Sequence, residues 1–393
     1  MTISRKIEKF VGETTWIRKI FEEGVELKKR VGEDRVYDFS LGNPILDPPE
    51  EFYEQLRSLV LHPRKGMHRY MQNAGYPEVR RAIAEVLAAE TGVMVTQENV
   101  VMTCGAGGGI NIVLKAILDE GDEVIIISPY FVEYLYYIDN WGARAVIVPA
   151  GKDFNLDVSG ISESISPSTK AILINSPNNP TGVVYPEETL RELVKAIEEA
   201  KRRYGRDIYL VSDEPYRRII YDNVKCPWIF PIYRDSMIVT SSSKDLGLSG
   251  ERIGYAAVHP GCKDGDRIIA GMIFNMRALG YVNAPALMQN ILRSIGRATV
   301  NVDEYRRKRD LLCEGLGDAG YEFVKPQGAF YLFSKSPIDD DVAFVRELQK
   351  ENILTVPGSG FGTPHYFRIA YCVEDETIVK AIPGFKKVFR SIK

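Results

Sequence analysis

The stretch SSSKDLGLSGER at residues 241–252 follows the apolar run Met237–Thr240 and places Lys244 at the end of an expected buried strand. A lysine at the rim of a protein core is partly desolvated, which favours its neutral, nucleophilic amine over the ammonium form. The three serine hydroxyls before Lys244 and the guanidinium of Arg252 are donors suited to a dianion such as a phosphate ester. The stretch predicts a nucleophilic lysine beside a phosphate site, and a solvated serine-rich turn is the alternative for this stretch alone.

The size and charge of the chain favour a two-domain protein that acts on small molecules. Its 393 residues are 45% hydrophobic and 26% charged, more chain than one hydrophobic core usually supports. A net charge of −3 offers no basic surface for nucleic acid, and no Lys/Arg-rich run indicates a membrane-surface helix. The charged N-terminus lacks the apolar core of a signal peptide and no 18-residue apolar run follows, so we expect a cytoplasmic protein.

The cysteines and histidines do not form a metal-binding pattern. The five cysteines are far apart and include no Cys-x-x-Cys pair, and the four histidines form no His-Glu-x-x-His motif. We therefore expect free thiols and no metal.

A glycine-rich turn follows the expected strand 99–103. Four of the five residues from Gly105 to Gly109 are glycines, although a glycine inside a helix costs about 1 kcal/mol relative to alanine. Bare backbone amides at a helix N-terminus bind phosphate, so Gly105, Ala106 and Gly107 are candidate phosphate ligands, with a tight strand-to-helix turn as the alternative. No acidic residue ends a second strand about twenty positions later, which disfavours a nicotinamide site.

Five candidate residues follow short apolar runs that we interpret as parallel strands. Ligands gather at the carboxyl ends of such strands, so these turns should face one crevice. The expected fold is α/β, with a large domain built on a mostly parallel sheet flanked by helices and a smaller α+β domain. We place the large domain at residues 45–290 and the small domain at residues 1–44 and 291–393. The five residues are Gly105, Phe131, Asn179, Asp213 and Lys244.

The expected helices and strands can be given as ranges. Helices are expected at 13–30, 78–90, about 105–118, 186–204 and through 265–318, and strands at 123–128, 170–174, 207–211, 321–324 and 329–333. Near the end, Arg368 lies within the apolar run 365–371, and a buried arginine must pair with another group or face a ligand.

Taken together, the motifs resemble those of class I aminotransferases, enzymes similar to aspartate aminotransferase with the fold of type I pyridoxal-phosphate-dependent transferases. The resemblance spans residues 38–375 and rests on Asn-Pro-Thr-Gly at 179–182, Asp-x-x-Tyr at 213–216, Ser-x-x-Lys-x7-Arg at 241–252 and Arg-Ile-Ala at 368–370. Together these motifs are far more specific than any one of them.

The resemblance implies how the chain would hold pyridoxal 5′-phosphate. Lys244 would carry it as a Schiff base and move the substrate proton, and Asp213 would pair with the ring nitrogen. Tyr216 and Asn179 would hydrogen-bond the 3-oxygen, and Phe131 would stack on the ring. The phosphate would be held by Gly105, Ala106, Gly107, Ser241, Ser243, Arg252 and, from the neighbouring subunit of a homodimer, Tyr70.

The resemblance also implies the substrate contacts. Arg368 would clamp the α-carboxylate, Gly42 would place its backbone amide against it, and Asn179 would lie beside it. The chain departs from the family at Gly107, where many relatives carry a hydroxyl or amine side chain, so a polar contact is lost.

The expected activity is transfer of the amino group of an L-amino acid to a 2-oxo acid such as 2-oxoglutarate, in amino-acid metabolism. We expect neutral or aromatic donors, because the chain shows no certain second cation for a distal carboxylate, with Arg18 and Arg277 as unplaced candidates. A lyase of the same fold that eliminates at Cβ or cleaves C–S bonds would use the same residues. A non-catalytic regulator on this fold would need an added DNA-binding domain, which the chain has no length for.

Overall fold

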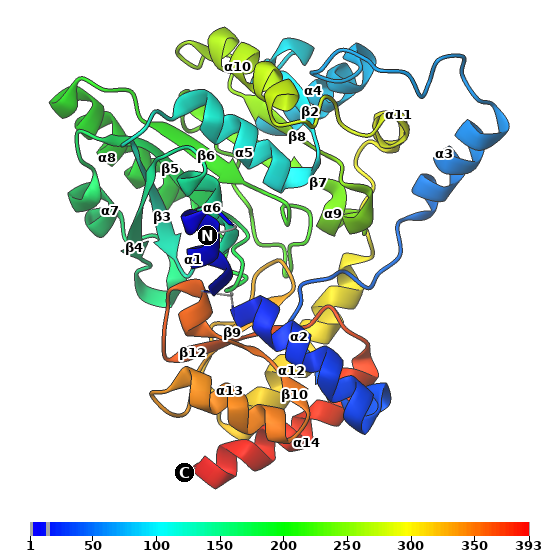
Figure 1. Ribbon diagram of the computed structural model, residues 1–393, viewed down its shortest axis with the longest axis vertical. Helices are drawn as coiled ribbons and strands as arrows, with labels where there is room; N and C mark the ends of the chain where they lie inside the picture. The colour runs from blue at the N-terminus through cyan, green and yellow to red at the C-terminus, as the bar shows by residue number, and fades with distance from the viewer. Residues whose placement is uncertain (1–2, 13–15, 393) are drawn as a thin grey trace.

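A seven-stranded sheet forms the centre of the protein, whose computed structural model describes residues 3–12 and 16–392 (Figure 1). The strand order is β2-β8-β7-β6-β5-β3-β4, and only β8 runs antiparallel to its neighbours in this sheet. The expected mostly parallel sheet is therefore confirmed. The strands are β2 (Val100–Thr103), β3 (Glu123–Ser128), β4 (Arg144–Pro149), β5 (Thr169–Asn175), β6 (Tyr209–Asp213), β7 (Ser236–Ser241) and β8 (Gly254–Val258).

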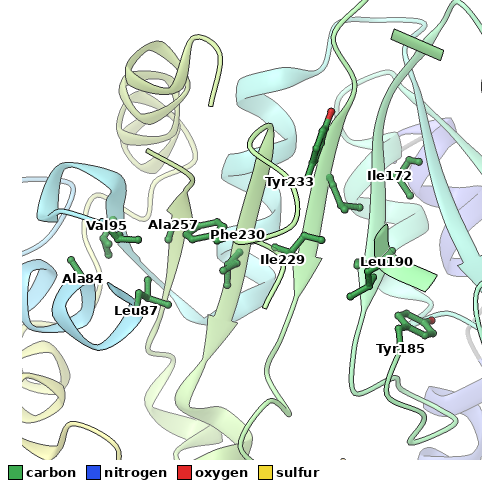
Figure 2. Close-up of a cluster of buried hydrophobic side chains, with 14 of the residues drawn as sticks. Ala84, Leu87, Val95, Ile172, Tyr185, Leu190, Ile229, Phe230, Tyr233 and Ala257 are labelled. Atoms are coloured by element: carbon green, nitrogen blue, oxygen red, sulfur yellow. The ribbon is translucent and has the colours of Figure 1, made fainter. Parts of the chain in front are cut away.

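Helices cover both faces of this sheet, which explains why its central strands have continuous apolar runs and are buried along almost their whole length rather than alternating. One face packs against α5 (Gly105–Ile117), α6 (Glu133–Asp139) and α10 (Gly265–Ala278). The core on the other face includes α4 (Pro77–Thr91), α7 (Val158–Ser164), α8 (Glu187–Tyr204) and α11 (Ala286–Ile295), and α3 (Glu50–Leu61) packs on α11. Figure 2 shows part of this second core, with Leu87 of α4, Ile172 of β5 and Leu190 of α8 among the side chains.

A separate hydrophobic core joins the two ends of the chain below the large sheet (Figure 1). It combines α2 (Trp16–Val31) and β1 (Tyr37–Asp38) with α12 (Val302–Ala319), α13 (Asp341–Lys350) and α14 (Asp375–Ile392). Its strands are β9 (Tyr331–Lys335), β11 (Val356–Pro357) and β12 (Tyr366–Ala370) in one antiparallel sheet, and β10 (Ile353–Leu354) paired with β1. We propose that residues 45–290 form the large domain and that residues 1–44 and 291–393 form the small domain.

The first two helices of the chain contact different parts of the molecule. Helix α1 (Arg5–Gly12) lies against α6 through the Lys6–Asp139 ion pair and the Phe10–Tyr136 ring contact at 5.0 Å. The helix expected from residue 13 is α2, and residues 13–15 lie outside the described residues. Within the part of the chain that the structure describes, no helix is long and apolar enough to cross a membrane.

Three expectations about the C-terminal half need correction. Residues 321–324 do not form a strand, since Phe323 makes only a single bridge to Ser334 and Pro326 lacks the amide that would extend the pairing. The strand expected at 329–333 begins at Tyr331 instead, because Ala329 has a φ of 56°, which a strand does not allow. The helical region 265–318 consists of α10, α11 and α12, and breaks follow at Gly280 and Gly296, which both have positive φ.

Candidate active site

A cavity of about 310 Å³ lies at the carboxyl ends of the central strands and reaches the smaller sheet. Of the residues expected at the site, Gly42, Ala106, Gly107, Phe131, Asn179, Asp213, Tyr216, Ser241, Ser243, Lys244, Arg252 and Arg368 all line it. Gly105 lies beside it, and Tyr70 lies outside it with 87% of its surface exposed. The topology thus collects residues that are up to 326 positions apart from Gly42 to Arg368.

Lys244 lies on the short helix α9 (Ser242–Asp245), which begins where strand β7 ends. Its Nζ donates to the carbonyl of Gly42 at 2.6 Å and lies 5.6 Å from the centre of the Phe330 ring. Burial lowers the pKa of Lys244 to about 8, helped by the positive charges of Arg368 and Arg252. A useful fraction of this amine is therefore neutral near pH 7, as a nucleophile requires.

Asp213 is the last residue of β6, which ends two residues later than expected. Tyr134 of α6 donates its hydroxyl to Oδ2 of Asp213, whereas Oδ1 is buried and has no hydrogen-bond partner among the described residues. Burial raises the pKa of Asp213 to about 7, although the Tyr134 hydrogen bond opposes that rise. An unpaired carboxylate oxygen inside a cavity is costly, which indicates a ligand that brings a proton to it.

A chain of amide hydrogen bonds links Asp213 to Arg368. Asn175 donates to the carbonyl of Asp213 at 2.9 Å and accepts from the amide of Asn179 at 2.7 Å. The Nη1 of Arg368 donates to Oδ1 of Asn179 at 3.1 Å, and Nη2 donates to the carbonyl of Ser40 at 2.5 Å. Arg368 is 2% exposed, and its Nε has no partner among the described residues, so a donor remains for a ligand.

A tyrosine pair forms another wall of the cavity. The hydroxyls of Tyr216 and Tyr331 lie 2.8 Å apart, and burial raises the pKa of Tyr216 well above its usual range. A Cβ at Gly42 would lie 1.9 Å from the Tyr331 hydroxyl, so only glycine fits there. Gly42 was expected to offer its amide to a carboxylate, and here its carbonyl accepts from Lys244.

The mouth of the cavity is positively charged. Arg252 has a left-handed φ of 52° and donates to the carbonyl of Ser249 at 2.9 Å. Its Nη2 lies 2.8 Å from the place that a Cβ of Gly105 would occupy, and Gly105 itself has a φ of 74°. Both facts require glycine at the start of α5, where unpaired amides and the helix dipole favour an anion.

These groups fit pyridoxal phosphate. The unpaired Oδ1 of Asp213 suits a protonated ring nitrogen, and the α5 N-terminus with Arg252 suits the phosphate. The Lys244 amine, with its lowered pKa, suits the aldehyde. Among the described residues there is no group of three or more His, Cys, Asp or Glu side chains that could hold a metal ion.

Comparison with known proteins gives the same assignment. A family model described as aminotransferase class I and II matches residues 34–384. The aspartate/prephenate aminotransferase of Thermus thermophilus is 34% identical over 368 residues, which are 92% of this chain and 92% of the relative. A solved amino transferase from Eubacterium rectale is 38% identical, with a TM-score of 0.97 and coverage of 100% of both chains. Aspartate aminotransferase from Thermus thermophilus with maleate is 30% identical with a TM-score of 0.87, and the match covers 99% of this chain and 100% of that chain.

The chain therefore belongs to the class I and II aminotransferases. It has the type I fold and is an enzyme that uses pyridoxal phosphate.

Several residues of the cavity could not be found from the sequence. Tyr134 and Tyr137 of α6 line it, although they lie in an aromatic run that could equally have been core. Tyr331 lines it from β9, where a tyrosine in an apolar strand looks like packing. Asn175 lines the cavity one residue beyond the strand expected at 170–174, and its position at that strand end is the only sequence signal for a role.

Proposed function

We propose that the enzyme transfers the amino group of an L-amino acid to 2-oxoglutarate, with pyridoxal phosphate attached covalently to Lys244. The observation that carries this proposal is one cavity that holds a lysine with a pKa near 8 and a buried carboxylate with an unpaired oxygen. When bound, the cofactor supplies an electron sink for the bond that breaks at Cα.

The residues of the chain then have distinct roles in the proposal. Asp213 holds the proton of the ring nitrogen, and Tyr216 with Asn179 orients the ring through its 3-oxygen. Phe131 packs on the ring, and the serines 241 and 243 hold the phosphate with Arg252. Lys244 would move the proton at the substrate Cα, since its amine lies in the same cavity and burial lowers its pKa to about 8.

Arg368 is proposed to bind the α-carboxylate of every substrate, because its unpaired Nε and its position in the cavity leave it a donor. The other cations among the described cavity residues are Lys244 and Arg252, which the cofactor uses. Neither Arg18, which pairs with Glu22, nor Arg277, which is exposed on α10, lines the cavity. We therefore propose neutral and aromatic donors, and the name of the Thermus relative, which joins aspartate and prephenate, is compatible with a broad site.

We also propose a homodimer in which Tyr70 completes the partner's site. Tyr70 lies outside the cavity of its own chain and is exposed, and Val60 and Leu61 at the end of α3 are exposed apolar side chains as well. Light scattering tests this state directly, and a monomer at the concentrations of the activity assay would contradict it. The cytoplasmic location and the role in amino-acid metabolism stay predictions.

The function is tested with a panel of ¹⁵N-labelled amino acids incubated with 2-oxoglutarate. Mass spectrometry should find the label in glutamate, together with the 2-oxo acid of each active donor. Release of ammonia or a thiol without labelled glutamate would identify the lyase of the same fold instead. Label transfer only from aspartate and glutamate would contradict the proposed donor range.

A further inference from the structure

The backbone conformation at position 107 does not explain why this residue is a glycine. It lies inside helix α5 and is not among the glycines with positive φ, so an alanine would be favoured there by about 1 kcal/mol. A Cβ at this position would lie 2.9 Å from the hydroxyl oxygen of Tyr137, closer than a carbon atom can approach it without a shift. The absence of a side chain at Gly107 therefore makes room for the Tyr137 hydroxyl.

The Tyr137 hydroxyl lines the cavity and is a donor without an acceptor. It forms no hydrogen bond with any residue of 3–12 or 16–392. Burial, together with the carboxylates of Glu133 and Asp213, raises the pKa of Tyr137 well above its usual range. The phenol thus keeps its proton, and on the wall of the cavity it is a donor that a ligand oxygen can accept from.

The surroundings of this hydroxyl favour an anionic oxygen. The hydroxyl lies beside Gly107, two residues after the start of α5 at Gly105. The first amides of this helix have no acceptor within it. The Arg252 guanidinium lies against Gly105 on the same turn, and its charge acts on Tyr137. A hydroxyl, a guanidinium and a helix N-terminus at one place make a site for a phosphate or a carboxylate.

We propose that Tyr137 is a ligand-binding residue whose hydroxyl donates to an anionic oxygen, in the place that a side chain at position 107 would otherwise fill. This inference rests on the proposed function. The oxygen belongs either to the cofactor phosphate or to the distal carboxylate of a dicarboxylic substrate. An uncharged hydroxyl is well suited to the second case, because it can bind the distal carboxylate of one substrate and still accept the uncharged side chain of another. A lysine in its place would exclude the uncharged side chain.

The test compares Tyr137→Phe with the wild type and with Tyr136→Phe, a control on the same helix whose ring packs on Phe10 and does not line the cavity. Two quantities are measured: the dissociation constant of pyridoxal phosphate from the cofactor-depleted protein, and KM for 2-oxoglutarate and for a neutral donor. Loss of a hydrogen bond to a charged group weakens binding by roughly 10- to 100-fold.

A weaker cofactor affinity in Tyr137→Phe would assign the hydroxyl to the phosphate. A higher KM for 2-oxoglutarate, with an unchanged KM for the neutral donor and unchanged cofactor affinity, would assign it to the distal carboxylate. If all three values match those of the wild type and the control, the proposal is overturned. If the wild type transfers no amino group, the proposed function fails, and the cofactor affinities still decide the phosphate contact.

A second variant guards against a general packing defect. Gly107→Ala should displace the hydroxyl and weaken the same binding step, but it should cause no further loss when Tyr137 is already phenylalanine. Equal losses from Gly107→Ala in both backgrounds would show that the hydroxyl is not the group involved.

Discussion

The carboxylate that the chemistry requires should destabilise the cofactor-free protein, and Asp213→Asn tests this. Burial raises the pKa of Asp213 from its ordinary 3.8 to about 7. Between these pH values the native state binds a proton that the unfolded state has lost, so stability falls as pH rises from about 4 to 7 and stays low above. Asparagine carries no charge and removes this dependence.

The magnitude follows from the pH interval. Over the two pH units from pH 5 to pH 7, the native carboxyl largely keeps its proton while the unfolded one is ionised. This difference corresponds to about 2.7 kcal/mol in the free energy of unfolding. Any fixed cost of the asparagine amide is the same at both pH values and cancels in the comparison. The free energy of unfolding of the cofactor-free variant, relative to that of the wild type, should therefore be about 2.7 kcal/mol higher at pH 8 than at pH 5.

The assay is thermal unfolding of the cofactor-free proteins at pH 5 and pH 8, where the extra gain should appear as roughly 2–6 °C. The same variant should lose roughly 10²–10³-fold in turnover after reconstitution, because it cannot hold the ring proton. Asp245→Asn is the matched control, since burial also raises the pKa of Asp245 to about 7 but its side chain does not line the cavity. It should show the pH-dependent gain and retain turnover. Equal shifts of Asp213→Asn at both pH values would show that burial does not raise the pKa of Asp213 in the cofactor-free protein.

Three further predictions concern the charged groups around the cavity. Arg252→Ala should weaken binding of pyridoxal phosphate by roughly 10- to 100-fold, measured by absorbance titration, and an unchanged affinity would remove Arg252 from the phosphate site. Arg368→Leu should raise KM for donor and acceptor alike by roughly 10-fold or more in steady-state assays, whereas an effect on one substrate alone would contradict a shared α-carboxylate clamp. The rate of covalent cofactor attachment should rise about tenfold per pH unit and level off above about pH 8, because burial lowers the pKa of Lys244 from 10.5 to about 8 and only the neutral amine reacts. A rate that keeps rising to pH 10 would show an ordinary, solvated lysine.

The sequence was sufficient to expect the large sheet and the residues at its edge. Lys244 and Asp213 lie at the ends of β7 and β6, and a buried strand is visible as an apolar run whose end must reach the ligand edge of a parallel sheet. Arg368 could be found for a similar reason, since a charge inside an apolar strand needs a partner. The position of a polar residue at the end of an apolar strand, or inside one, therefore predicts that it belongs to the site.

The contacts between elements could not be expected in this way. The 2.8 Å contact of Tyr216 with Tyr331 depends on how β9 packs below the large sheet, and no local pattern encodes that. The fit of Tyr137 against Gly107 depends on the approach of α6 to α5. The strand shift at 329–333 depends on the positive φ of Ala329, which an alanine adopts only when tertiary contacts hold it there.

Borohydride reduction of the reconstituted enzyme tests whether Lys244 carries the cofactor. Reduction fixes the cofactor to the amine that holds it, and peptide mass analysis then locates the modified lysine. We expect the mass of reduced pyridoxal phosphate on Lys244, and none on this residue once an L-amino acid has been added in excess before reduction. Modification of another lysine, or of none after full reconstitution, would contradict this assignment.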